Sequence, residues 1–246
     1  MMLLGCSDSD IAKRQALEFA LYNGATPISC EASFTHQQDI WTIENLSFFV
    51  SDLKFYTFDN KEIVPIFDES PWQNENVALI KFDTSCDDSI PSNQSLKFTF
   101  DGEMQDLHSI EFSLSVPFTQ NHLNPLTQAS PLNDSSMFWS WRMGYKFMRI
   151  DMTSDDSSWL FHLGSLGCVS QSSVRAPQEE CKVPNRIKIA ADLTSNKPII
   201  TLDIAALLDE IEVINGDSCM FNHDQTQVCG EVIKNLSSGR VFRWKE

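Results

Sequence analysis

The chain is built from short apolar runs separated by turn residues, with no alternation of strand-like and helix-like segments. The clearest run covers residues 110–116, where Ile110, Phe112, Leu114 and Val116 share one face and polar residues occupy the other. Short strands at this spacing without βαβ units are typical of an antiparallel sandwich or barrel. We therefore expect an all-β fold, an antiparallel β-sandwich with long loops.

Other segments of the same kind give the expected element list. Strands are predicted at 16–22, 28–34, 46–58, 77–82, 96–100, 137–150, 159–163, 186–190 and 199–203, and short helices near the C-terminus at 204–214 and 227–236. The first two strands should form a hairpin around the Asn23-Gly24 turn. Three prolines make 117–136 a long loop, and long loops often carry function.

A single domain over residues 15–246 is the favoured organisation, preceded by a polar tether over residues 1–14. The alternative is that residues 178–246 form a disulfide-stapled appendage. No apolar run approaches the length of about 18 residues that a membrane-spanning helix needs.

Charge and missing motifs exclude several function classes. The formal net charge is −16, whereas nucleic-acid binding depends on clustered Lys and Arg, so no nucleic-acid partner is expected. The chain has no HExxH zinc-protease motif, no GxSxG nucleophile elbow and no glycine-rich phosphate loop. The sequence therefore predicts a protein that is not an enzyme.

Seven cysteines point to an exported protein. Leu3-Leu4-Gly5-Cys6 resembles the lipobox of bacterial lipoproteins, in which the cysteine is acylated, and Ser7 after it favours outer-membrane sorting. The other six cysteines form an even set, which reads as disulfides with fifteen possible connectivities. Short spacings favour Cys168–Cys181 and Cys219–Cys229, which leaves Cys30–Cys86.

An aromatic-rich segment at 131–147 contains Phe138, Trp139, Trp141 and Tyr145 within a few residues of one another. Trp and Tyr need both packing surface and a hydrogen-bond partner when they are buried. The segment is therefore either a dense core strand or a wall around a reactive centre.

Several of these segments together resemble one family, the MbnP-like proteins, which belong to the "metallo-mystery pair" with a four-Cys motif. The resemblance covers roughly residues 15–240 and is most specific in the middle third. It rests on the following segments: Leu46–Leu53, Val116-Pro117, Asn121-His122, Pro131–Asn133, Met137–Trp141, Gly144–Phe147, Phe161–Gly164, and the cysteines Cys168, Cys181, Cys219 and Cys229.

The resemblance implies copper binding by histidines and by one tryptophan that a partner cytochrome oxidises to kynurenine. The family's His-x4-Trp arrangement maps onto His36 and Trp41, with Trp41 as the kynurenine. His122 is the expected second histidine ligand, and His108 is held in reserve. A competing assignment makes Trp139 or Trp141 the modified residue. A spacing of five puts His36 and Trp41 on opposite faces of one strand, so only a loop or bend can bring them together.

The implied partner is a dihaem MauG/peroxidase-like cytochrome, and the implied role is copper acquisition or storage rather than catalysis. The protein is then a lipid-anchored outer-membrane lipoprotein of the periplasm or cell surface. The alternative is a surface adhesion or interaction domain of the same β-sandwich class that binds no metal, because disulfides and acidity fit that role equally well.

Overall fold

The computed structural model describes residues 14–172, 174–193, 199–213, 218–220 and 227–245. The expected tether, with the lipobox at Cys6, lies outside these residues apart from position 14. Within the described part of the chain, no helix has the length and apolar character needed to cross a membrane.

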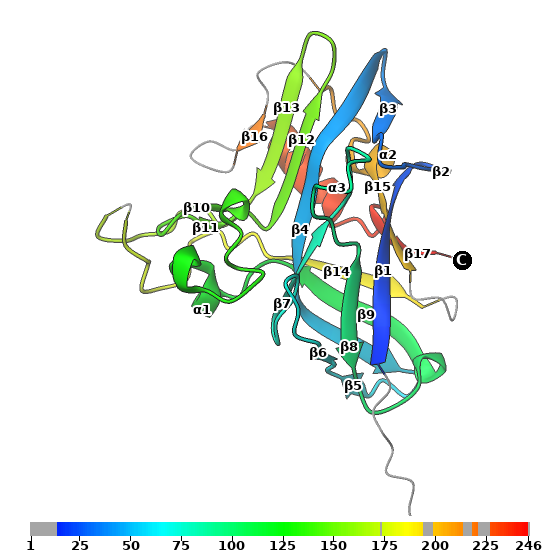
Figure 1. Cartoon of the computed structure of the whole chain (residues 1–246), viewed down its shortest axis with the longest axis vertical. Helices are drawn as coiled ribbons and strands as arrows, with labels where there is room; N and C mark the ends of the chain where they lie inside the picture. The colour runs from blue at the N-terminus through cyan, green and yellow to red at the C-terminus, as the bar shows by residue number, and fades with distance from the viewer. Residues whose placement is uncertain (1–13, 173, 194–198, 214–217, 221–226, 246) are drawn as a thin grey trace, which may run out of the picture.

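Two large sheets form the body of the molecule (Figure 1). The first has the order β17-β15-β1-β8-β6, with β2 beside β1. Its strands are β1 (Arg14–Asn23), β2 (Thr26–Pro27), β6 (Ile66–Phe67), β8 (Ser95–Thr99), β15 (Ile199–Asp203) and β17 (Phe242–Trp244).

The second sheet has the order β14-β9-β4-β12-β13-β16, and β3, β5 and β7 also pair with β4. Its strands are β3 (Ser33–His36), β4 (Asp39–Thr57), β5 (Glu62–Ile63), β7 (Val77–Lys81), β9 (Leu107–Leu114), β12 (Met148–Thr153), β13 (Ser158–Leu163), β14 (Ile187–Asp192) and β16 (Cys219–Met220). β4 is the organising strand, because it pairs with five others along its 19 residues.

The core lies between the two sheets and is rich in phenylalanine. Phe19 of the first sheet packs edge-on against Phe48 and Phe112 of the second, with ring centroids 5.4 and 6.1 Å apart. Phe242 on β17 contacts the same two rings, at 5.5 and 5.9 Å. Such edge-to-face pairs add about 0.5–1.5 kcal/mol each beyond the burial of their area. The predicted sandwich is therefore confirmed, with two parallel pairs, β1–β15 and β13–β16, among mostly antiparallel ones.

The segment after residue 178 is part of this body and not an appendage. β14 pairs with β9 over six residues in one sheet, and β15 lies between β1 and β17 in the other. The apolar side chains of Ile200 and Leu202 are fully buried in the common core. Helix α3 (Gln227–Leu236) matches the predicted helix, whereas α2 (Ile204–Leu207) is a single turn.

The expected long loop and aromatic segment form a protrusion on one side of the sandwich, on the left in Figure 1. It includes α1 (Phe118–Asn121), the hairpin of β10 (Phe138–Ser140) with β11 (Gly144–Tyr145), and two 3-10 turns, η2 (Pro125–Thr127) and η3 (Ser135–Met137). A further 3-10 turn, η1 (Met104–Asp106), directly precedes β9. The predicted strand at 137–150 is thus broken by a turn at 141–143.

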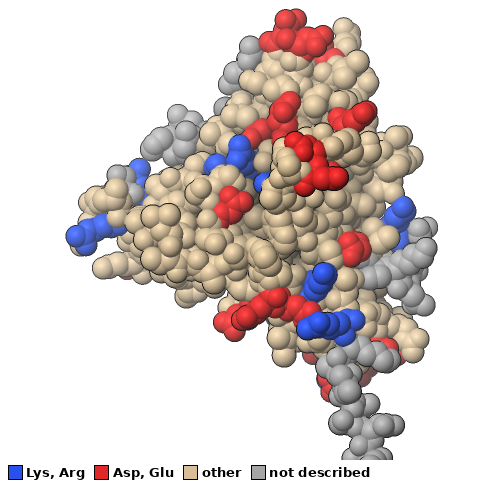
Figure 2. All heavy atoms as spheres, in the orientation of Figure 1, with Lys and Arg blue, Asp and Glu red and all other residues tan. Residues whose placement is uncertain are grey.

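On the face shown in Figure 2, acidic and basic side chains are interspersed over the described residues.

Candidate metal centre

The β3–β4 hairpin brings His36 and Trp41 onto the same face of the sheet. In its register His36 lies opposite Asp39, and Phe34 lies opposite Trp41. Residues directly opposite in an antiparallel pair share a face, so His36 and Trp41 are diagonal neighbours, about 7–8 Å apart. The turn depends on Gln37, whose φ of 56° reverses the chain direction within two residues. The hairpin turn is the bend that the sequence analysis required between the two residues.

The hydrogen bonds of His36 fix which ring nitrogen is free. Its Nε2 lies 2.9 Å from the carbonyl oxygen of Ile211, and the side-chain amide of Gln37 donates to the same oxygen at 3.2 Å. A carbonyl oxygen only accepts, so in the neutral ring Nε2 carries the proton and the lone pair is on Nδ1. A histidine whose other nitrogen is bonded to a carbonyl is the usual arrangement of a metal ligand. His36 is half-buried, whereas Trp41 is 1% exposed.

His122 lies elsewhere, in the protrusion, where it ends α1 as its C-cap. The ring is 5% exposed, and its Nδ1 donates to the carbonyl oxygen of Trp141 at 3.0 Å. Burial lowers the pKa of His122 and outweighs that hydrogen bond, which acts in the opposite direction. The imidazole is therefore neutral near pH 7, with its lone pair on Nε2.

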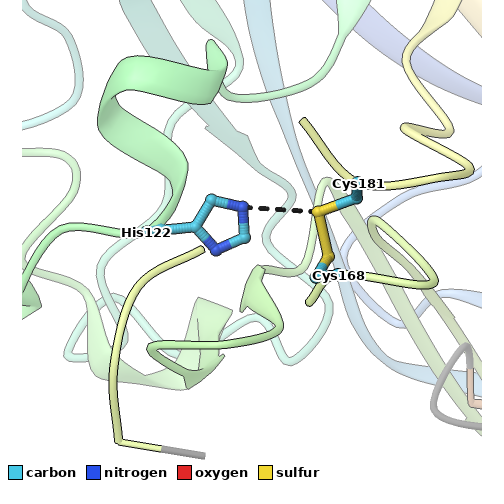
Figure 3. A group of neighbouring side chains, drawn as sticks. All are labelled: His122, Cys168 and Cys181. Carbon is cyan, nitrogen blue, oxygen red and sulfur yellow. Dashed lines mark hydrogen bonds between the residues drawn. A yellow bond between two sulfur atoms is a disulfide. The ribbon is translucent and has the colours of Figure 1, made fainter. Parts of the chain in front are cut away.

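The Nε2 of His122 faces a disulfide (Figure 3). The side-chain amide nitrogen of Asn121 donates to it at 3.1 Å, and Asn121 is oriented by accepting the Tyr145 amide at 2.8 Å. The Sγ of Cys181 lies 3.6 Å from the same nitrogen. Neither atom of this last pair carries a proton in the disulfide-bonded state, so it is a close contact.

His122, Cys168 and Cys181 form a group whose ligand atoms all lie within 4.8 Å of one another. The two sulfurs are bonded to each other, however, and metal binding by cysteine needs the thiolate. In this state the group offers one imidazole nitrogen and no sulfur ligand.

All three predicted disulfides are confirmed. Cys30–Cys86, Cys168–Cys181 and Cys219–Cys229 close sequence separations of 56, 13 and 10 residues.

The structure does not assemble the expected site from His36, His122 and Trp41. β9 ends opposite Val50, and α1 follows from there, whereas His36 lies opposite Asp39. At about 3.3 Å per residue these positions are roughly 35 Å apart along β4. Figure 1 shows β3 and α1 on opposite sides of the molecule. The two imidazoles were expected to meet across a loop-rich end, but register along one long strand separates them.

The reserve histidine is still farther away. His108 stands at the start of β9, next to the pairing of Leu107 with Thr57, which is the far end of β4 from His36. The positions on β4 opposite His36 and Leu107 are roughly 60 Å apart along the strand. The ring of His108 contacts Phe58 at 5.7 Å between centroids. His108 therefore cannot share an ion with His36.

A fourth histidine, His162 on β13, has a specific polar environment. Its Nε2 donates to Asp151 Oδ1 at 2.6 Å, and Arg149 Nε donates to Asp151 Oδ2 at 2.8 Å. Burial raises the pKa of Asp151, but the bonds from His162 and Arg149 outweigh it and leave the pKa lowered. The Nδ1 of His162 is buried with no hydrogen-bond partner among the described residues.

The two other candidate tryptophans lie beside these buried histidines. Trp139 is half-buried, with its ring centroid 6.4 Å from that of His162, and the Trp141 carbonyl holds His122. A β-carbon at Gly164 would lie 2.4 Å from the Trp139 ring, so this glycine makes room for the indole. Alternation along β12 puts Arg149 and Asp151 on one face, whereas the position of His162 beside them is set by the register of β12 with β13.

Comparisons with known proteins give two findings. The family model described as MbnP matches residues 12–221. The solved structure of MbnP from Methylosinus trichosporium superimposes with a TM-score of 0.76 at 20% sequence identity, over 94% of this chain and 98% of that one. No curated protein gives a significant match.

Proposed function

Because the chain belongs to the MbnP family, we propose that it binds one copper ion outside the cytoplasm, with His36 and a modified Trp41 at the site. The observation that carries the proposal is the register of the β3–β4 hairpin, which puts these two residues on one face. The free Nδ1 of the half-buried His36 ring supports it, because imidazole nitrogen suits copper. Copper is also at the top of the divalent affinity order.

Trp41 would contribute only after oxidation. An indole nitrogen donates a hydrogen bond and has no lone pair for a metal. Cleavage of the indole C2–C3 bond adds one oxygen to each carbon, and hydrolysis of the resulting formyl group releases formate. The product, kynurenine, carries an aryl amine and a ketone that can coordinate copper. The net step would consume two molecules of hydrogen peroxide per tryptophan and release two of water, so peroxide is the oxidant, and a dihaem MauG/peroxidase-like cytochrome would be the catalyst.

The burial of Trp41 bears on how such a partner would act. At 1% exposure the indole has no surface for direct contact with another protein. Electrons would therefore leave Trp41 through the surrounding side chains, of which Phe34 is the cross-strand neighbour. Function in copper acquisition or storage requires only binding and release, and no catalytic step by this chain is part of the proposal.

Placement outside the cytoplasm is supported by the three disulfides, since such bridges persist in oxidising compartments. Acylation of Cys6 would anchor the domain at the outer membrane, with the following polar residues as the tether. The rival function, a surface adhesion or interaction domain, needs neither copper nor an altered tryptophan.

The test combines peptide mass spectrometry with copper titration. The chain is produced with and without its cytochrome, and the peptide containing Trp41 is examined for conversion to kynurenine. Copper is then titrated into the wild type, His36→Ala and Trp41→Phe, with His108→Ala as a matched control at the other end of β4. We expect both site variants to lose the copper and the control to keep it.

Three outcomes would contradict the proposal. Conversion confined to Trp139 or Trp141 would move the site to the protrusion. Equal copper binding by His36→Ala and wild type would exclude the hairpin as the ligand site. If no form of the protein binds copper, the surface-domain function is favoured.

A further inference from the structure

The disulfide beside His122 can become a second metal site. We propose that reduction of Cys168–Cys181 creates a site for one thiophilic cation, Cu(I) in the first instance, held by His122 Nε2 and the two cysteine sulfurs. This site is separate from the hairpin site, since α1 and β3 are on opposite sides of the molecule (Figure 1).

The histidine is already oriented for this role. Its Nδ1–H is held by the Trp141 carbonyl at 3.0 Å, which leaves the lone pair on Nε2. The close-up in Figure 3 shows that this nitrogen points at the Cys181 sulfur. A ligand histidine bonded through its other nitrogen to a backbone carbonyl has its tautomer and ring orientation fixed before the metal arrives.

The distances match a metal centre with one nitrogen and two sulfur ligands. With metal–sulfur bonds of about 2.3 Å and metal–nitrogen bonds of about 2.0 Å, neighbouring ligand atoms are roughly 3.5–3.8 Å apart. His122 Nε2 and Cys181 Sγ are 3.6 Å apart in the structure. Two changes are needed: the sulfurs must separate, and the cation must replace the Asn121 amide, which donates to Nε2 at 3.1 Å. One of the sulfurs is on a half-buried residue, Cys168. Soft thiolate ligands select Cu(I) and Zn²⁺.

A surface cavity lies beside the bridge. A cavity of about 790 Å³ runs along the 168–181 loop and is lined by residues next to both cysteines, Gly167, Val169, Glu180 and Lys182. Cys168 is half-buried and Cys181 is 4% exposed, against 0% and 2% for Cys219 and Cys229, whereas the Cys30–Cys86 bridge is more exposed than either of these. Within the described residues, the His122 group is where three candidate His, Cys or carboxylate ligand atoms come together.

The chemistry balances with a dithiol reductant. The dithiol transfers two electrons and two protons to Cys168–Cys181 and is itself oxidised to a disulfide. The two new thiols then release their protons when the cation binds, because thiolate is the metal ligand. Reoxidation of the bridge would remove both sulfur ligands and release the ion. The bridge thereby makes metal affinity at this site dependent on the redox state.

The test uses the full-length chain and Cd²⁺, whose thiolate complexes absorb in the ultraviolet, with Cu(I) as the second probe. The protein is treated with a mild dithiol, freed of reductant, and a sample is alkylated so that mass spectrometry identifies which bridges opened. The variants are His122→Ala and the double variant Cys168→Ser/Cys181→Ser, with His108→Ala as the control. Circular dichroism checks that each form is folded.

We expect the reduced wild type to gain one cadmium–thiolate site per chain that the oxidised protein lacks. The Cys168→Ser/Cys181→Ser variant retains the other bridges, and it should show no such site. His122→Ala should bind at least about tenfold more weakly, since even outer-shell changes cost 10–100-fold in metal affinity. His108→Ala should match the wild type.

Three results would overturn the inference: a Cys168–Cys181 bridge that stays closed in the folded chain, equal Cd²⁺ affinity with and without His122, or an undiminished signal in the double cysteine variant. None of these readings depends on copper at His36, which is measured on the oxidised protein. Loss of the hairpin site would leave the result at His122 unchanged.

Discussion

Removing the Cys30–Cys86 bridge is expected to lower the free energy of unfolding by about 4 kcal/mol. The change is Cys30→Ser with Cys86→Ser. The bridge closes a separation of 56 residues, and chain-entropy reasoning assigns a loop of this length about 4 kcal/mol at 25 °C. Cys86 is exposed and Cys30 is half-buried, so little packing is lost with the sulfurs. The effect should therefore arise almost entirely from the freedom regained by the unfolded chain.

The measurement is equilibrium unfolding in urea, followed by tryptophan fluorescence and by far-ultraviolet circular dichroism. The matched comparison is Cys168→Ser with Cys181→Ser, whose separation of 13 residues corresponds to about 3 kcal/mol. A loss below about 1 kcal/mol for the Cys30–Cys86 pair would refute the reasoning, because it would mean that the unfolded chain is already constrained in this region. Coincident transitions by the two probes are required for the values to be comparable.

Two further predictions concern the packing and charge around β12 and β13. Asp151→Asn should make the free energy of unfolding less dependent on pH in acid. The lowered pKa of Asp151 contributes stability that is complete above the unfolded value near 3.8 and is lost as the pH falls through the folded value. The free energy of unfolding of the variant should therefore change less steeply below about pH 4, and an unchanged slope would contradict the lowered pKa. Gly164→Ala should destabilise the fold by about 1–3 kcal/mol, because its Cβ would lie 3.0 Å from the Tyr145 carbonyl as well as against Trp139. Gly230→Ala, in α3 with nothing within 4 Å, is the control and should be neutral or stabilising by up to about 1 kcal/mol; equal effects at both glycines would refute the steric argument.

Much of the sandwich could be predicted from local sequence alone. The apolar runs at 77–82, 96–100, 110–116, 159–163 and 199–203 correspond to strands. Burial alternates with a period of two in β8 and β15, a local pattern, whereas β7 is buried at four consecutive residues. The run at 46–58 belongs to β4, which continues through a register shift between Ser51 and Lys54, where Asp52 has a φ of 53°. Bulges of this kind have no dependable sequence signal, since they are set by the partner strand.

The hairpins were harder to predict. The Asn23-Gly24 turn is present, but β2 is only two residues long, and the apolar residues after it leave for the other sheet. The second hairpin, β3–β4, has Gln37 at its positive-φ position, where glycine, asparagine or aspartate would have been the recognisable signal. The predicted helix at 204–214 begins correctly after the Asp203 cap but ends at Leu207.

Part of the candidate site could be predicted from local sequence, and part depends on how strands pair. The disulfide pairings could be inferred from spacing, because short loops close most readily. The hairpin face shared by His36 and Trp41, and the separation of His36 from His122, depend on strand register, which is a property of two segments and not of one. The Asp151–His162 pair was missed for this reason, since its members are on different strands.

The central position of β4 also has a consequence for the nascent chain. Of its five partners only β3 precedes it; β5, β7, β9 and β12 all follow, and the last is not complete until Thr153. A chain threaded through a translocation channel from its N-terminus would therefore emerge with the apolar stretch Leu46–Val50 unpaired on both edges. Such an unpaired stretch aggregates readily, so we expect the first half of the chain to need shielding until the second half is made.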